Sequence, residues 1–215
     1  MPYQIFFSKE SIGRKIDKLL GGWKEFEVGE KLFDDSVLLE GKSPDLLLFL
    51  NLRTRQFISQ ILFSAYNFSI HPKETNVLLY PLYYRKPSAV INLINGIIDI
   101  FERIKNDHDS VTLLYENLKM EINPGMKLKM LYTIMDDGFG NRKEKAPIVD
   151  LLLKDSDWMI RIHTAAQLGE KGTDLLLHFY NESIDRQSKL LIVRILAESK
   201  IPQAKEFILQ CLESN

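Results

Sequence analysis

Four histidines are the side chains of this sequence best suited to acid–base chemistry or to binding a metal ion. They are His71, His108, His163 and His178, and no two of them stand four residues apart as in a helical metal site. The one cysteine, Cys211, has no second thiol with which to form a metal site or an intramolecular disulfide. The sequence therefore predicts no metal centre and no cofactor.

Three acidic pairs are the other candidates for catalysis: Asp34–Asp35, Asp136–Asp137, and Asp155 with Asp157. Two neighbouring carboxylates can act as acid and base or bind a divalent cation. The first pair, however, stands at the entry of a predicted strand, and Asp157 stands where a helix cap is expected. We therefore expect no catalytic residues, and the sequence favours a protein that is not an enzyme.

A glycine-rich turn, Asp136 to Asn141, has backbone amides that could cradle a phosphate. It lacks the Lys-Ser/Thr ending of a phosphate-binding loop and does not follow a predicted strand. Its two aspartates would also repel an anion. The sequence favours a loop between helices.

An aromatic and basic cluster has the composition that stacks on bases or binds phosphates: Tyr80, Tyr83, Tyr84, Arg85 and Lys86. The alternative is a hairpin edge whose tyrosines cover the core of their own domain. Both interpretations stay open. Tyr83, Tyr84 and Arg85 are the first candidates for contact with a nucleotide or a lipid headgroup.

The elements that must position these residues differ between the two parts of the chain. In residues 1–122 strand-like and helical segments alternate, which predicts an α+β domain with a small antiparallel sheet. The expected strands are Tyr3–Ser8, Trp23–Val28, Ser36–Glu40, and a hairpin of Tyr66–His71 with Asn76–Leu82. Helices are expected after Ser8 or Ser11, from Ser43 to Leu50, over Thr54–Ala65, and over Ser88–Lys105.

In two of these helices the spacing of the apolar residues predicts which face is buried. In the helix over Thr54–Ala65 the predicted apolar stripe is Phe57, Ile58, Ile61 and Leu62, and the predicted solvent side is Arg53, Arg55 and Gln60. In the helix over Ser88–Lys105 the residues expected to face inward are Val90, Ile91, Ile94, Ile97, Ile98 and Phe101.

Residues 123–215 show helical periodicity and an internal repeat. Asp157, with the base and aliphatic residues that follow it, has counterparts 28 residues later from Asp185 and 34 residues earlier from Asn123. Further helices are expected at Glu144–Leu153, Thr173–Tyr180 and Gln203–Leu212.

The segment Lys154–Gly172 resembles the second helix of a HEAT repeat, of the type also seen in phycobilisome lyase-like proteins. The resemblance implies that Asp157 caps this helix and that Ile160 is buried. It also implies that Arg161 pairs with a loop carboxylate of a neighbouring unit. Together with its flanking units, the segment suggests an all-α HEAT-like solenoid over residues 123–215.

The same resemblance assigns small residues to the end of this helix. Ala165 and Ala166 would let it pack closely on its neighbour, and Gly169 or Gly172 would end it in the left-handed conformation.

A second resemblance involves Phe26–Val37 and Leu47–Arg55. It is to uncharacterised bacterial proteins, in which a glycine–acid pair and a phenylalanine–aspartate pair precede a strand and a helix carrying an arginine. Some of them have a membrane anchor upstream, which we do not find here. This resemblance implies no activity.

Charge and hydropathy limit the possible partners. The chain has 28 basic and 29 acidic residues, and residues 123–215 contain 13 of each. Neither part is basic enough to bind a polyanion by its overall charge, so nucleic acid is not the expected partner. No run of about 20 apolar residues predicts a transmembrane segment. The single cysteine suggests a reducing compartment, and we expect a cytoplasmic protein.

Helical repeats mainly bind peptides and proteins through a continuous surface. The sequence therefore favours a non-enzymatic protein–protein interaction or scaffold module, with Trp158 and Arg161 as candidate contacts. Trp158 could equally pack against the preceding helix. The alternative functions are a nucleic-acid-binding HEAT-like protein and, from the resemblance alone, a lyase-like enzyme acting on a tetrapyrrole.

Overall fold

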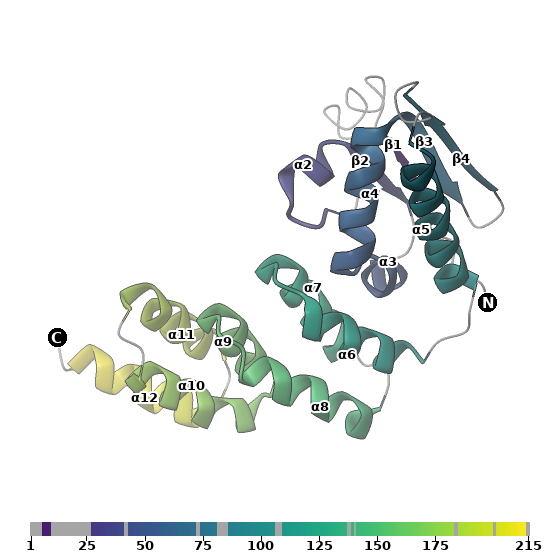
Figure 1. Cartoon of the computed structure of the whole chain (residues 1–215). Coiled ribbons are helices and arrows are strands. Elements are labelled where there is room, and N and C mark those ends of the chain that lie inside the picture. Colours follow the sequence, from purple (N-terminus) through teal and green to yellow (C-terminus); the bar gives the residue numbers. More distant parts are fainter. Residues whose placement is uncertain are drawn as a thin grey trace. The chain divides into compact units, whose positions relative to one another are not determined.

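The computed structural model describes residues 6–9, 27–40, 43–71, 74–80, 86–105, 109–136, 139, 141–182, 185–199 and 201–213. The chain divides into two compact units, Met1–Met130 and Leu131–Asn215. In the described residues the chain is mostly helical, with a small antiparallel sheet in the first unit and a helical region after it (Figure 1). The predicted small antiparallel sheet and helical C-terminal region are confirmed.

The sheet of the first unit has the strand order β2-β1-β3-β4, and each neighbouring pair is antiparallel. The strands are β1 (Phe6–Lys9), β2 (Val37–Glu40), β3 (Ala65–His71) and β4 (Glu74–Leu79). Strands β3 and β4 form the predicted hairpin, with His71 opposite Glu74. Four of the predicted strands are therefore present within a few residues of their expected bounds.

Two other predictions fall partly or wholly outside the described residues. Of the expected strand Trp23–Val28 only Glu27 and Val28 are described, and they are not in a strand. The backbone N–H groups of Val28 and Gly29 instead donate to the carboxylate of Asp34, each at 2.8 Å. The helix expected after Ser8 or Ser11 lies in the part of the chain that the structure does not describe.

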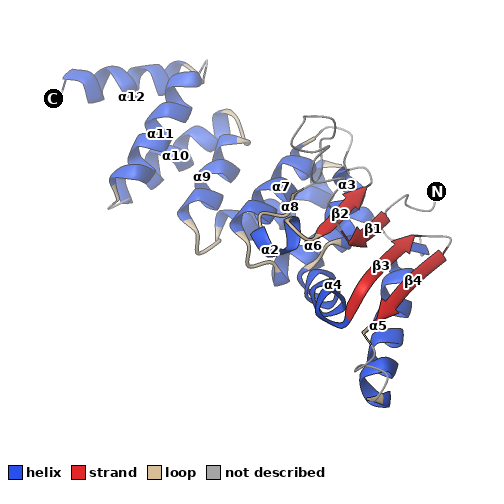
Figure 2. Ribbon diagram, turned by 90° about the horizontal axis from the view of Figure 1, so that it is seen from above, coloured by secondary structure: helices blue, strands red, loops and turns tan. Residues whose placement is uncertain are grey.

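The helices of the first unit are α2 (Lys31–Asp34), α3 (Ser43–Phe49), α4 (Leu52–Ser64), α5 (Pro87–Lys105) and α6 (Ser110–Met120). Helix α7 (Pro124–Met135) contains the division between the units. Helix α4 lies beside β3 (Figure 2). Helix α3 packs against α5 and α6. The run Leu46–Leu50 is buried at every position, as expected for a segment that is apolar on all sides.

The predicted inward face of α5 is wrong at three positions. Ile91, Ile94 and Ile98 are 56%, 50% and 47% exposed. Gly96 of α5 lies so close to the ring of Phe57 that an added Cβ would be 2.1 Å from Phe57 Cε2. Helix α4 therefore packs against the side of α5 that has the smallest residue, and the isoleucine stripe is left exposed.

The second unit contains α8 (Arg142–Leu153), α9 (Trp158–Ala166), α10 (Glu170–Glu182), α11 (Arg186–Glu198) and α12 (Pro202–Glu213). Each of these helices packs against the next, and α9 also packs against α11. Its core is formed by α9 to α12, with Ile162, Leu176, Ile192 and Ala204 among the buried residues.

The predicted repeat positions are helix caps. Asn123 accepts the N–H of Met126 at 3.2 Å, and Asp157 accepts the N–H of Met159 at 2.8 Å. Asp185 accepts the N–H of Gln187 at 2.8 Å. Helices α7, α9 and α11 thus each begin directly after an equivalent capping residue.

The two glycines proposed as helix terminators have different roles. Gly169 has a φ of 61°, which confirms the left-handed conformation after α9. Gly172 is buried inside α10, where an added Cβ would be 1.8 Å from the carbonyl oxygen of Ala165. Gly172 therefore ends no helix; it allows α10 to approach the end of α9.

Among the described residues, no helix is both long enough and apolar enough to cross a membrane.

Candidate binding sites

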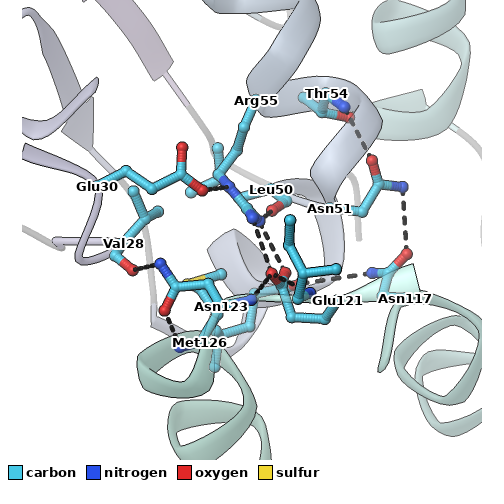
Figure 3. Close-up of polar contacts among 12 residues, drawn as sticks. Val28, Glu30, Leu50, Asn51, Thr54, Arg55, Asn117, Glu121, Asn123 and Met126 are labelled. Atoms are coloured by element: carbon cyan, nitrogen blue, oxygen red, sulfur yellow. Dashed lines mark hydrogen bonds and ion pairs between the residues drawn. The ribbon is translucent and has the colours of Figure 1, made fainter. Parts of the chain in front are cut away.

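A buried arginine of the first unit is surrounded by polar groups from several segments (Figure 3). Arg55 of α4 was predicted to be on the solvent side, but its side chain is only 1% exposed. Its Nη1 and Nη2 donate to the two carboxylate oxygens of Glu121, each at 2.9 Å, and its Nε donates to Glu30 at 2.9 Å. Nη1 also donates to the carbonyl oxygen of Leu50 at 2.6 Å. The predicted solvent position of Arg55 is therefore wrong. Two carboxylates and a carbonyl oxygen accept the hydrogen bonds that water would accept at an exposed arginine.

The carboxylate of Glu121 is fully enclosed and fully bonded. Besides Arg55 it accepts the backbone N–H groups of Ile122 at 3.0 Å and Asn123 at 2.9 Å. Burial lowers the pKa of Arg55, but the hydrogen bonds and negative charges of Glu121 and Glu30 outweigh it, so that the pKa is raised above its ordinary value. Arg55 therefore stays charged.

Two buried asparagines continue this network. Asn51 caps α4 by accepting the N–H of Thr54 at 2.9 Å, and its amide donates to Asn117 Oδ1 at 3.2 Å. The amide of Asn117 donates to the carbonyl oxygen of Leu48 at 2.6 Å. The cluster joins α3, α4, α6 and the start of α7. Because its donors and acceptors bond to one another, we assign the cluster a structural role.

The second unit holds an arginine in a different environment. At the start of α9, Trp158 is half-buried and packs edge to face against Phe179 of α10, with ring centroids 5.7 Å apart. The guanidinium carbon of Arg161 lies 3.7 Å from the centroid of the Trp158 ring and 5.9 Å from that of Phe179. We call these three residues the Trp158–Arg161 stack.

Arg161 has no ion pair and no hydrogen bond among the residues that the structure describes, and its Nε is buried without a partner. The pairing with a loop carboxylate that the HEAT resemblance implied is therefore not observed there. Trp158 lies three residues before Arg161 on the same helix, so the two side chains share one side of α9. The indole is the surface on which the guanidinium rests.

The start of α9 is held by its own loop. The carboxylate of Asp155 accepts the N–H of Asp157 at 2.9 Å, and Asp157 caps the helix. Asp155 and Asp157, the third acidic pair of the sequence, thus hold the loop and the first turn of α9. Ile160 and Ala165 are buried as expected, whereas Met159, between Trp158 and Ile160, is 48% exposed. Met159 therefore lies on a solvent-facing side of α9.

Other candidates from the sequence are only partly described. Tyr83, Tyr84 and Arg85 lie outside the described residues. Of the same cluster, Tyr80 and Lys86 are exposed. The structure therefore leaves the aromatic and basic cluster as a prediction.

The histidines do not gather at one place in the described structure. His163 Nδ1 is 3.0 Å from the hydroxyl oxygen of Tyr132, and burial lowers the pKa of His163. His178 is exposed and lies 3.3 Å from Glu182. His108 and the side chain of His71 are not among the groups that the structure describes. Among the described residues, no three metal-ligating side chains form a group that could hold an ion.

Of the remaining acidic and glycine-rich candidates, Asp34 ends α2, whereas Asp136 and Asn141 lie between α7 and α8. Asp34 binds the backbone of the loop before α2. The segment Asp136 to Asn141 connects α7 and α8, where the carbonyl oxygen of Asp136 accepts Lys145 Nζ at 2.8 Å. Asn141 forms a capping box with Glu144 at the start of α8. The loop interpretation is supported by these contacts.

The chain was compared with family models, curated protein sequences and solved structures, and no match was found in any of the three comparisons.

Proposed function

We propose that this chain is a non-enzymatic protein-interaction module and that the Trp158–Arg161 stack contacts an acidic side chain of its partner. The proposal rests on the environment of the Arg161 side chain. Its guanidinium is held on an indole and has no carboxylate among the described residues.

A stacked arginine suits recognition of a carboxylate. Stacking restricts the side chain before binding, so less conformational entropy is lost when a partner is bound. A planar guanidinium can then offer paired N–H donors to a carboxylate. Tryptophan and arginine are also the residues that most often dominate the binding energy of protein interfaces.

The surroundings of the stack favour a protein partner. The Trp158–Arg161 stack itself combines two aromatic rings with one cation, a composition typical of protein interfaces. Residues 123–215 contain 13 basic and 13 acidic side chains, whereas a groove for nucleic acid needs an excess of positive charge. Nucleic-acid binding is therefore the competing function to be tested.

We propose further that the second unit is a short HEAT-like solenoid. The packing of each helix on the next and the additional contact of α9 with α11 support this arrangement. The equivalent caps Asn123, Asp157 and Asp185 support a repeat with a common register. In a solenoid of this kind, α9 and α11 would lie side by side and extend the surface around the stack.

The experiment compares two arginine variants as bait in quantitative affinity capture from the native lysate. Arg161→Gln is expected to lose the partner, and Arg194→Gln is the matched control. Arg194 is exposed, lies in the same unit and pairs with Glu198 at 3.1 Å. The captured protein is then purified and its affinity measured. We expect Arg161→Gln to weaken binding by about tenfold to a hundredfold.

Equal capture by both variants would contradict the proposal. A salt-dependent shift of DNA by the purified chain, lost in Arg161→Gln, would favour the nucleic-acid alternative instead.

A further inference from the structure

A second cation of the second unit is held on an aromatic ring. Lys189 of α11 has its Nζ 5.0 Å from the ring centroid of Tyr180 in α10. Lys189 is half-buried, and its side chain has no ion pair and no hydrogen bond among the described residues. Its environment is thus of the same kind as that of Arg161, which rests on Trp158 and Phe179.

The internal repeat places these two cations at equivalent positions. Asp157 caps α9 and Asp185 caps α11, and each base stands four residues after its cap. Helix α9 packs against α11, and both helices pack against α10. The rings that hold the cations include Phe179 and Tyr180, which are consecutive residues in the last turn of α10. The two cations therefore lie at one end of the unit, where α10 ends and where α9 and α11 begin.

The acidic side chains of the same segments already have partners. Residues 155–161 and 182–189 contain four acidic and three basic residues. The acidic ones are Asp155, Asp157, Glu182 and Asp185. The three aspartates accept backbone N–H groups at the helix starts, and Glu182 lies 3.3 Å from His178. With this balance of charge, the surface has no net attraction for a polyanion, and a ligand must be held by individual cations.

We propose that Arg161 and Lys189 together bind an acidic segment of a protein partner, with one carboxylate of the segment on each cation. This inference rests on the proposed function and extends it from one contact to two. Each cation is restrained by a ring and has no acceptor among the described residues, so its binding costs little side-chain entropy. The two contacts also reinforce each other, because the first raises the effective concentration of the second carboxylate.

The packing of the helices sets the approximate spacing of the two carboxylates. The axes of directly packed helices are about 8–10 Å apart. An extended chain advances about 3.3 Å per residue. Because α9 and α11 pack directly, a segment that crosses both should carry its acidic residues about two to four positions apart.

Synthetic peptides test the pair by NMR titration of the isotope-labelled full chain. Glycine–serine peptides carry two glutamates that are two, three or four positions apart, and the reference peptides carry one glutamate or two glutamines. We expect the best two-glutamate peptide to bind about tenfold more tightly than the one-glutamate peptide. The resonances that shift should be those at the starts of α9 and α11.

Variants of the second cation show whether it makes the additional contact. Lys189→Gln should lower the affinity for the best two-glutamate peptide by about tenfold, to that of the one-glutamate peptide. Lys189→Arg should retain the affinity, because it keeps the charge. The matched control is Lys205→Gln, which removes an exposed base of α12 in the same unit and should have no effect.

A second glutamate that adds no affinity at any spacing would overturn the paired site, and so would equal effects of Lys189→Gln and Lys205→Gln. If the one-glutamate peptide still binds and Arg161→Gln abolishes this binding, the contact of the proposed function stands and only the pair fails. If no glutamate peptide binds in a way that depends on Arg161, the carboxylate contact of the stack fails as well. Tighter binding of a matched peptide with two phosphoserines would overturn the choice of carboxylates.

Discussion

Two arginines, one in each unit, are held in opposite ways. Arg55 is enclosed in the first unit, with two carboxylates and a carbonyl oxygen bonded to its guanidinium. Arg161 in the second unit rests on an indole, with neither a carboxylate nor a hydrogen bond among the described residues. The comparison separates two uses of one side chain. An arginine whose three guanidinium nitrogens all donate to acceptors of its own unit organises the fold, whereas a restrained arginine without an acceptor among the described residues can serve recognition.

The largest expected effect comes from removing the carboxylate beside Arg55. Glu121→Gln should lower the free energy of unfolding by about 3 kcal/mol, because a buried charge loses its main partner. Urea unfolding measures the change. The control is Glu116→Gln, which removes an exposed ion pair with Lys119 and should leave the free energy of unfolding nearly unchanged. Equal effects would show that the Arg55 cluster does not stabilise the first unit.

A matched pair of conservative substitutions sharpens the contrast. Arg55→Lys should cost about 2 kcal/mol, because lysine keeps the charge but loses the bidentate contact with Glu121 and one of the other donors. Arg161→Lys should change the stability by no more than about 0.5 kcal/mol, because no hydrogen bond of Arg161 is lost. Thermal unfolding of both variants measures the difference. Similar losses of stability in Arg55→Lys and Arg161→Lys would mean that the two arginines contribute equally to the stability of the fold.

The position of Arg55 could not be predicted from local spacing. Its main partner, Glu121, is 66 residues away in the sequence, and a charged residue between apolar ones is ordinarily placed on the solvent side. One signal was available. The segments that resembled uncharacterised bacterial proteins include both Glu30 and Arg55, which the structure brings to 2.9 Å.

The fold was easier to predict than the faces of its helices. Turn residues and caps such as Asp157 act locally, so helix starts and the hairpin could be assigned from the sequence. The exposed stripe of α5 could not, because the approach of Phe57 to Gly96 decides which side is buried. At the candidate site, Trp158 and Arg161 were identified, but their contact with each other was not. The indole of Trp158, three residues before Arg161 in the same helix, lies closer to the guanidinium than the ring of Phe179 does.

Trp158→Ala tests whether the second arginine rests on a structural residue. Trp158 packs edge to face on Phe179, and the core of the second unit extends to it. We expect a loss of about 2 kcal/mol, less than for a fully buried tryptophan because the side chain is half-buried. The melting temperature measures it. A negligible change would mean that Trp158 is a surface contact alone, as the sequence left open.

The smallest effect on stability, and the most informative for function, is expected for Arg161→Gln. Only the cation–π contacts with Trp158 and Phe179 are lost, so the free energy of unfolding should fall by about 0.5 kcal/mol or less. Partner binding should nevertheless weaken much more than in Arg194→Gln, because a carboxylate of the partner would lose its donors. Calorimetric titration with the purified partner and urea unfolding of the same samples give both quantities. If stability falls by as much as in Trp158→Ala while binding is unchanged, Arg161 serves the fold as Arg55 does, and the contrast between the two arginines disappears.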